Sequence, residues 1–317
     1  MKILVTPTSM RPDKPSKALE TLQAFSSDLV FNPTQKPLTE DELIPLLQDC
    51  DGYLAGLDFV TDKVIAACPK LKVISRYGAG FDRVDVAAAK AIDLPVTNTP
   101  GVNAEAVGEL AFGLIIALAR RIPYLNNQTR AGEWVRSTGM ELKGKTIGIF
   151  GLGAIGKVVA RCAQGFGMNV IAYDPFIDEA YCQENHIENC SQAEVLSRAN
   201  VISLHLPLND ETINYINRET IAKMPDGAII VNTSRGGIIN EDDAYTALKS
   251  GKLLGLGLDA FAIEPPVGSP LFELDNVVVT PHTGAHTAEA TQNMANAAVK
   301  NLIDVLSGND CSFVVNR

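Results

Sequence analysis

The sequence has 317 residues, more than a single hydrophobic core usually organises, so two domains are expected. Hydrophobic residues make up 46% and charged residues 20%, a composition typical of globular proteins that excludes a disordered or fibrous chain. The formal net charge of -10 argues against a nucleic-acid surface, because binding to phosphates needs clustered lysine and arginine.

The six cysteines show no CxxC pair, and the start of the chain, MKILVTP, leaves no room for the core of a signal peptide. We therefore expect reduced thiols, a cytoplasmic location and no metal site. The longest apolar run, 110–119, is too short to span a bilayer, so no membrane contact is expected.

Short apolar runs alternate with helix-like stretches in the first hundred residues. Strands are predicted at 3–5, 52–55 and 73–75, and a helix at 62–67. Such alternation is typical of an α/β fold with a parallel sheet and crossover helices. Dense turn residues at 97–101 mark a domain boundary, and a long helix is predicted from about 103 to 121.

A second series of strand-like runs begins at residue 146. Its six members, separated by helix-sized segments, are 146–150, 169–173, 201–204, 228–232, 254–258 and 277–280. Six strands at that spacing predict a doubly wound sheet. After residue 287 the apolar positions have helical spacing, and too few residues remain for a third domain, so we expect the tail to pack on the first domain. The predicted division is 1–99 with 288–317, and 100–287.

The clearest motif is a strand followed by a glycine-rich turn and a helix start, at 146–160, which reads TIGIFGLGAIGKVVA. Gly151 permits the tight turn, Gly153 lets the backbone approach a pyrophosphate, and Gly156 lets helix and strand pack closely. Asp174 ends the next predicted strand, where a carboxylate can bind both ribose hydroxyls. A Rossmann NAD domain is therefore expected. NAD is favoured over NADP, since Asp174 would repel a 2′-phosphate and no nearby arginine compensates.

Three further motifs follow predicted strands: VNTSRGG at 231–237, GLDAFAIEP at 257–265 and VTPHTG at 279–284. With them the chain resembles the D-isomer-specific 2-hydroxyacid dehydrogenase family over almost its whole length, and within it the D-3-phosphoglycerate dehydrogenase-like branch. The resemblance implies two doubly wound parallel-sheet domains, a flavodoxin-like substrate domain and a Rossmann NAD domain, with the active site in the cleft between them. It also implies hydride transfer between NAD(H) and a small anionic 2-hydroxy or 2-keto acid, with 3-phosphoglycerate among the candidates.

In that family the Arg, Glu and His of these motifs are catalytic, which implies Arg235, Glu264 and His282. The chemistry needs these residue types: arginine holds a carboxylate with two donors, and histidine gives and recovers a proton near neutral pH. A neighbouring carboxylate orients the imidazole and stabilises its charged form. Taken singly, Arg235 could be an ordinary surface arginine and Glu264 a solvated loop residue.

The resemblance also implies the cofactor contacts. Beside the three glycines and Asp174, it places on NAD the residues Ala154, Ile155, His205, Pro207, Thr212, Thr233, Asp259 and His282. His205 would lie beside the cofactor without acid–base work. His186 reads as exposed, and His286 belongs to a substrate loop or has no role.

The loop at 75–80, SRYGAG, carries substrate contacts by the same resemblance, at Arg76, Tyr77, Gly78 and Ala79, together with Arg235. Backbone N–H groups of a glycine-rich turn can bind a carboxylate. Two interpretations of Arg76 stay open: it neutralises a second anion, as in phosphoglycerate dehydrogenases, or it is a structural ion-pair partner for Asp82 or Asp85.

Two alternative functions remain. One is a hydroxypyruvate or glyoxylate reductase. The other is an NAD(H)-sensing corepressor-like binding protein, although no basic tail or partner-binding extension is recognised. Formate dehydrogenase relatives carry Gln at the position of Glu264, so its carboxylate argues against formate. The chain ends soon after His282, so feedback by serine through a C-terminal domain is not expected.

Assembly is predicted from the helix at 103–121. Its segment 110–119 is too apolar to face solvent, so we expect a homodimer that buries it.

Overall fold

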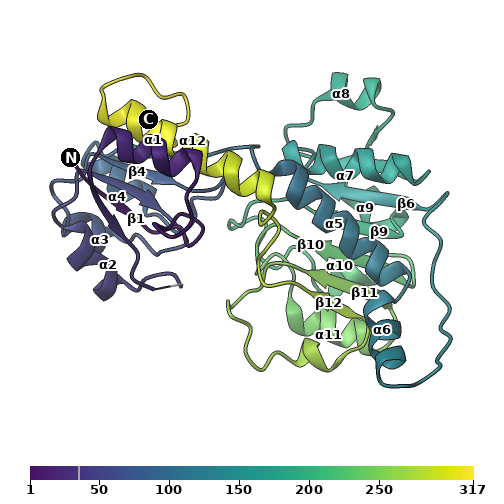
Figure 1. Ribbon diagram of the computed structural model, residues 1–317. Helices are drawn as coiled ribbons and strands as arrows, with labels where there is room; N and C mark the ends of the chain where they lie inside the picture. Colours follow the sequence, from purple (N-terminus) through teal and green to yellow (C-terminus); the bar gives the residue numbers. More distant parts are fainter. Residues whose placement is uncertain (35) are drawn as a thin grey trace. The chain divides into compact units, whose positions relative to one another are not determined.

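The computed structural model describes residues 1–34 and 36–317, which form two compact units (Figure 1). One unit combines Met1–Asn103 with His286–Arg317, and the other is Ala104–Ala285. Each is an α/β domain built on a parallel sheet, which confirms the fold class expected from the sequence. Among the described residues, no helix combines the length and the apolar character needed to cross a lipid bilayer.

The described residues of the first unit form five parallel strands in the order β2-β1-β3-β4-β5, the order of flavodoxin-like folds. Its strands are β1 (Lys2–Val5), β2 (Asp28–Phe31), β3 (Gly52–Ala55), β4 (Val73–Arg76) and β5 (Val96–Thr97). Its helices are α1 (Lys17–Phe25), α2 (Glu40–Leu47), α3 (Asp62–Ala66), α4 (Val86–Ala91) and α12 (Ala288–Leu306).

Side chains of this sheet alternate between two cores, because successive residues of a strand point to opposite faces. Ile3 and Val5 pack in the core formed with α1 and α12, whereas Leu4 packs in the core formed with α2, α3 and α4. The Ser75 hydroxyl donates to the Ala298 carbonyl at 2.8 Å and ties α12 to β4. Helix α12, which comes from the far end of the sequence, is thus an integral part of the first unit.

The second unit has seven parallel strands in the order β12-β11-β10-β9-β6-β7-β8, which is the order of Rossmann folds with one strand added. Its strands are β6 (Thr146–Phe150), β7 (Asn169–Tyr173), β8 (Glu188–Asn189), β9 (Val201–Leu204), β10 (Ala228–Asn232), β11 (Leu253–Leu258) and β12 (Val277–Val279). Its helices are α5 (Ala104–Ala119), α6 (Ile122–Arg130), α7 (Ala154–Gly165), α8 (Glu179–Glu184), α9 (Gln192–Arg198), α10 (Arg218–Lys223), α11 (Glu241–Lys249) and the 3-10 turn η1 (Pro270–Glu273).

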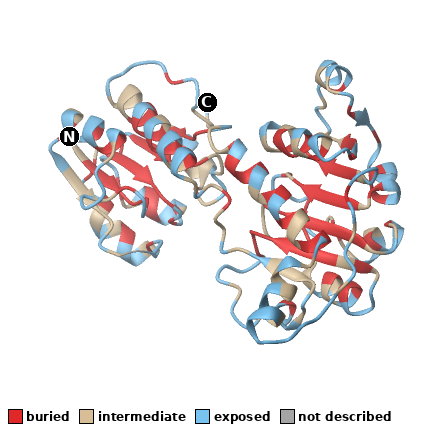
Figure 2. Cartoon of the chain, turned by 45° about the vertical axis from the view of Figure 1, so that its right-hand side comes forward, coloured by how far each residue is buried: buried red, intermediate tan, exposed pale blue. Residues whose placement is uncertain are grey.

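Figure 2 shows the central strands of both sheets in red, as buried, while the helices around them bury mainly one side. In the second unit, α5 and α7 cover one face around Ile147 and Ile149, and α9, α10 and α11 cover the other around Phe150 and Ile202. The strand order reverses between β6 and β9. In open parallel sheets ligands bind beyond the carboxyl ends of the strands at such a point.

Three observed strands are missing from the sequence prediction: β2, β5 and β8. Each lies at an edge of its sheet, and β5 and β8 have only two residues. An edge strand has one pairing partner and often a partly exposed face, so it needs no long apolar run. The expected long helix also ends earlier, because Arg121 adopts a left-handed backbone conformation and separates α5 from α6.

Candidate active site

The glycine-rich turn joins β6 to α7, and its three glycines have different surroundings. A Cβ on Gly151, whose φ is 91°, would lie 2.5 Å from the His205 carbonyl oxygen, and one on Gly156 would lie 2.2 Å from the Gly151 oxygen. Packing therefore requires both residues to be glycine. Around Gly153, by contrast, a Cβ would meet nothing within 4 Å. The backbone at Gly153 is open to a ligand at the amino end of α7, where helix N–H groups favour anions.

Asp174 follows β7 and is hydrogen-bonded to this turn. One carboxylate oxygen accepts the Leu152 N–H at 2.8 Å, and the other accepts the Phe176 N–H, also at 2.8 Å. Each carboxylate oxygen can accept a second hydrogen bond. The residue thus fixes the glycine turn and keeps acceptor capacity for ribose hydroxyls.

Arg235 stands on a turn directly after β10, and the buried side chain of Asn232 shapes that turn. The Asn232 amide donates to the Arg235 carbonyl at 2.7 Å, and its oxygen accepts the Ser234 N–H at 3.0 Å. A Cβ on Gly236 would lie 1.8 Å from the Phe261 carbonyl oxygen. The Arg235 turn therefore packs directly against the segment that leads from β11 to Glu264.

Glu264 and His282 are in direct contact. The His282 Nδ1 lies 2.9 Å from a Glu264 carboxylate oxygen, and the two side chains are 35% and 23% exposed. Because an ionised carboxylate only accepts, Nδ1 donates the hydrogen bond and Nε2 is left for proton exchange. The same Glu264 oxygen accepts the Phe261 N–H at 3.3 Å.

Asp259 follows β11 and organises the loop that carries His282. Its buried carboxylate accepts the Thr280 hydroxyl at 2.6 Å, the Thr283 N–H at 2.8 Å and the Gly284 N–H at 2.8 Å. Because Thr280 precedes His282 in the chain and Thr283 and Gly284 follow it, these contacts fix the loop before and after His282. Sequence reasoning missed this positioning role, since it assigned Asp259 to the cofactor alone.

The structure places His205 behind the glycine turn, where it is suited to a neutral role. Its Nε2 lies 2.9 Å from the Ser203 hydroxyl, and burial lowers the pKa of His205 to about 4. The imidazole is therefore uncharged near neutral pH. Its Nδ1 and the Thr233 hydroxyl are buried and have no hydrogen-bond partner among the described residues. The Thr212 hydroxyl, by contrast, donates to the Pro207 carbonyl at 2.6 Å and closes the loop after β9.

The loop expected to bind substrate lies in the first unit, after β4. Arg76 is 5% exposed, and its guanidinium donates to the Gly80 carbonyl at 3.1 Å and to the Ala55 carbonyl at 2.9 Å. Of its two suggested carboxylate partners, Asp85 instead accepts the N–H of Ala88 at the start of α4. The described contacts of Arg76 thus tie the loop to β3.

The rest of this loop is anchored at its ends and open in its middle. The Tyr77 hydroxyl donates to the Thr291 carbonyl at 2.8 Å and accepts from Ser9 at 2.9 Å. The Asn98 amide donates to the Ala79 carbonyl at 2.8 Å. Gly78 has a φ of 138° and would place a Cβ in open space. The Gly78 carbonyl accepts the Thr99 N–H at 3.0 Å, so the backbone N–H groups near Gly78 are what the loop offers to a ligand.

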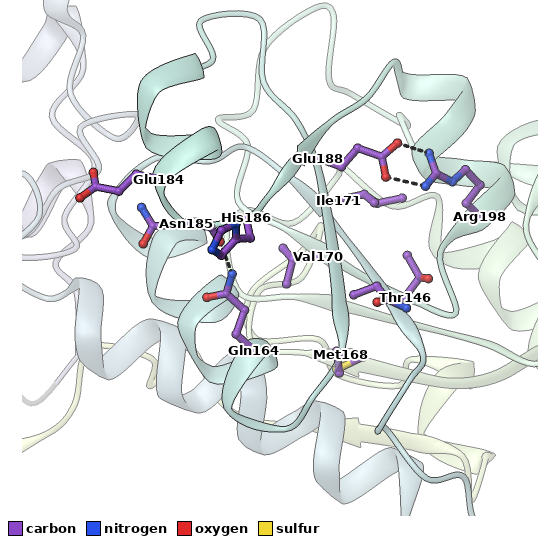
Figure 3. A pocket seen from close by; sticks show the side chains of 11 residues that line it. Thr146, Gln164, Met168, Val170, Ile171, Glu184, Asn185, His186, Glu188 and Arg198 are labelled. Atoms are coloured by element: carbon purple, nitrogen blue, oxygen red, sulfur yellow. Dashed lines mark hydrogen bonds and ion pairs between the residues drawn. The ribbon is translucent and has the colours of Figure 1, made fainter.

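A pocket of about 700 Å³ lies at the opposite edge of the second unit's sheet, where β6 and β7 begin (Figure 3). Glu188 and Arg198 pair there through two contacts of 2.7 Å each, and His186 lies exposed on its wall. None of the expected site residues lines this pocket. Since ligands of parallel sheets bind at the carboxyl ends of the strands, we exclude it from the candidate site.

Comparison with known proteins gives consistent relationships. Residues 112–284 match the family model described as "D-isomer specific 2-hydroxyacid dehydrogenase, NAD binding domain". The chain is 42% identical over 293 residues to hydroxypyruvate reductase of Thermotoga maritima, covering 90% of this chain and 95% of that protein. It is 43% identical over 283 residues to D-3-phosphoglycerate dehydrogenase of Methanocaldococcus jannaschii, covering 88% of this chain but 54% of that protein.

This chain therefore spans about half the length of the phosphoglycerate dehydrogenase relative. Among solved structures, D-lactate dehydrogenase from Aquifex aeolicus, complexed with NAD and lactic acid, superposes with a TM-score of 0.86 at 28% identity. That comparison covers 97% of this chain and 96% of the other.

Proposed function

Because the chain belongs to the D-isomer specific 2-hydroxyacid dehydrogenase family, as its motifs indicated, we propose that it transfers hydride between NAD(H) and the C2 carbon of a small 2-hydroxy or 2-keto acid. The contact between Glu264 and His282 carries this proposal, with Arg235 on the neighbouring turn. The three residues follow β10, β11 and β12, which are adjacent in the sheet. They supply a carboxylate ligand, a proton donor and the group that orients it.

NAD fits the residues present at the carboxyl edge of this sheet. The open backbone at Gly153 suits a pyrophosphate, and the unpartnered Thr233 hydroxyl and His205 Nδ1 suit polar cofactor atoms. The cofactor, when bound, supplies or accepts the hydride. We propose that the residues holding it are Gly151, Gly153, Ala154, Ile155, Gly156, Asp174, His205, Pro207, Thr212, Thr233, Asp259 and His282.

Side chains of the protein bind the substrate, transfer the proton and orient the proton donor. Arg235 binds the substrate carboxylate through its planar pair of donors and polarises the neighbouring carbonyl. As hydride reaches C2, the carbonyl oxygen gains negative charge and takes a proton from His282 Nε2. The Glu264 carboxylate stabilises the imidazolium and holds its ring. In the oxidative direction His282 takes the hydroxyl proton back.

For the substrate, we propose an unphosphorylated 2-keto acid of the size of hydroxypyruvate or glyoxylate. Arg76, the residue considered for a second anion, is buried and directs its hydrogen bonds to two backbone carbonyls. We propose that backbone N–H groups near Gly78 and Ala79 bind the carboxylate of the substrate. Phosphohydroxypyruvate stays as the second candidate, because the phosphoglycerate dehydrogenase relative is 43% identical to this chain.

We also assign functions to the two parts of the chain as expected from the sequence. Residues 1–99 with 288–317 would form the substrate-binding domain, and 100–287 the NAD-binding domain. All six cysteines are free, and five of them are buried. This agrees with a reducing compartment, and we propose a cytoplasmic location.

We propose a homodimer, although the apolar character of α5, on which the sequence-based prediction rested, does not support it. The apolar residues of α5 pack within their own unit against α7, β10 and β11, so no second copy is needed to cover them. A different feature supports association. The irregular arm at 131–139 is exposed and carries Trp134, whose surface is 83% exposed. Exposed tryptophans on such arms are typical of interfaces.

The activity is tested by screening 2-keto acids with NADH and following its oxidation. Turnover of hydroxypyruvate or glyoxylate, lost in Arg235→Ala and His282→Ala, is the expected result. NADH binding without turnover of any acid would move the protein to the cofactor-sensing class. Light scattering tests the dimer, and Trp134→Ser should yield particles of 33.9 kDa.

A further inference from the structure

Glu241 lies outside the sites assigned above, yet it contacts the segment that carries Glu264. It is the first residue of α11, and its carboxylate accepts the backbone N–H of Ala262 at 2.9 Å. Ala262 lies two residues before Glu264 on the loop that leaves β11. The contact therefore joins a helix start to the chain segment of the proposed catalytic carboxylate.

This segment is also attached through the contact between Glu264 and His282. Phe261 is buried, but the exposed stretch after it includes Ile263, which is 76% exposed. The Phe261 N–H donates to Glu264 itself, so that hydrogen bond does not fix the loop from outside. The backbone of Phe261 also packs closely against Gly236. The Ala262 N–H, two residues before Glu264, donates to the Glu241 carboxylate, which belongs to a different element, α11.

Helix α11 has other stabilising groups at its start besides Glu241. The Asn240 side chain already caps α11 by accepting the Asp243 N–H. Asp243 in turn accepts the Arg218 N–H at 2.9 Å, and Asp242 is an exposed carboxylate in the same turn. Both supply negative charge at the amino end of the helix, where it is favourable. Of the three acidic residues in this turn, Glu241 is the one described in contact with the loop of Glu264.

We propose that Glu241 is a positioning residue that holds the Glu264 carboxylate in place against His282. This inference rests on the proposed catalytic roles of Glu264 and His282. Removing the Glu241 acceptor frees the Ala262 N–H and lets the exposed loop move away from α11. A carboxylate displaced by a fraction of an ångström then orients the imidazole less well, and turnover falls while cofactor contacts elsewhere in the sheet remain.

The first test compares Glu241→Ala and Glu241→Gln with the matched control Asp242→Ala. We expect Glu241→Ala to lower kcat about ten- to hundredfold, the scale at which small misplacements act on catalysis. Glu241→Gln should recover most of the loss, because its amide oxygen still accepts a hydrogen bond. Asp242→Ala should leave kcat unchanged. NADH dissociation constants and thermal midpoints should match between Glu241→Ala and the control, and a shared loss of stability and binding would overturn the inference.

A double-mutant cycle with Glu264→Gln gives the decisive readout. If Glu241 acts through Glu264, then Glu241→Ala should cost much less in the Glu264→Gln background than in the native one. Equal losses in both backgrounds would make Glu241 an independent structural residue and overturn the inference. Should Glu264→Gln alone leave turnover intact, the proposed function of Glu264 fails and takes this inference with it. A loss in Glu264→Gln with none in Glu241→Ala rejects the inference alone.

Discussion

Asp259 and Gly284 meet at 2.8 Å, where the buried carboxylate of the aspartate accepts the backbone N–H of the glycine. A Cβ on Gly284 would lie 3.0 Å from the same carboxylate oxygen, so the close approach favours glycine. His282, two residues earlier, adopts a left-handed φ of 52°. The conformation of the His282 loop thus depends on a side chain that directly follows the neighbouring strand, β11.

Replacing Asp259 should therefore damage both catalysis and stability. Asp259→Ala leaves the donors of Thr280, Thr283 and Gly284 without their acceptor, which we expect to cost about 2–4 kcal/mol of unfolding free energy. Urea unfolding measures this loss, and kcat should fall at least tenfold because His282 is no longer held. Asp259→Asn, which keeps one acceptor oxygen, should lose less of both. Normal turnover in Asp259→Ala would show that the loop holds its shape unaided.

His282→Ala should lower turnover by roughly two to four orders of magnitude, the usual contribution of general acid–base catalysis. Binding of NADH should largely survive, because only one proposed cofactor contact is lost while the glycine turn and Asp174 are untouched. Steady-state kinetics and a fluorescence titration with NADH separate the two effects. His205→Ala is the matched control, and the assignment of the proton donor is wrong if that variant loses more turnover than His282→Ala.

The preference for NADH over NADPH should depend on Asp174. The enzyme should use NADH far better than NADPH, since the carboxylate would face a 2′-phosphate. Asp174→Asn removes the charge and should narrow the ratio of the two kcat/KM values. It should also weaken NADH binding, because one oxygen is lost from the contacts to Leu152 and Phe176. Similar efficiencies of the native enzyme with both cofactors would refute this role.

The local parts of the fold could be predicted because they depend on neighbouring residues. The strand, glycine turn and helix around Gly151 follow from backbone geometry and apolar pattern within fifteen residues of sequence. The buried strands of both sheets could be predicted as well, because each is a local run of apolar residues. The two-residue strands β5 and β8 could not be found, since their pairing with β4 and β7 leaves no pattern in such short segments.

The supporting contacts of the candidate site could not be predicted either. Asp259 reaches Gly284 across 25 residues, and Glu241 reaches Ala262 across 21. Such pairs form only when the sheet brings strand ends together, and a lone acidic residue in a sequence has many possible partners. Motifs indicated which side chains do the chemistry, whereas the structure was needed to show what holds them.

Stability should depend on pH through His205. Burial holds its pKa at about 4, whereas the value in an unfolded chain is near 6.5. As pH falls through this interval, the unfolded chain takes up a proton that the folded protein excludes. The free energy of unfolding should then decrease by up to about 1.4 kcal/mol per pH unit from this residue. Unfolding of His205→Asn should be less sensitive to pH between 7 and 5 than unfolding of the native protein, and equal sensitivity would contradict the buried, neutral imidazole.

Arg76 distinguishes the two substrate candidates. Its guanidinium donates to the carbonyls of Ala55 and Gly80, so Arg76→Ala should loosen the loop that carries Gly78 and Ala79. We expect kcat/KM to fall by a similar factor, about tenfold or more, with hydroxypyruvate and with 3-phosphohydroxypyruvate, because a displaced loop binds any carboxylate less well. Arg83→Ala is a useful control, since Arg83 belongs to the same unit and donates to the Leu57 carbonyl at 2.8 Å. A loss confined to the phosphorylated substrate would show instead that Arg76 turns toward a phosphate, and would favour the phosphoglycerate dehydrogenase assignment.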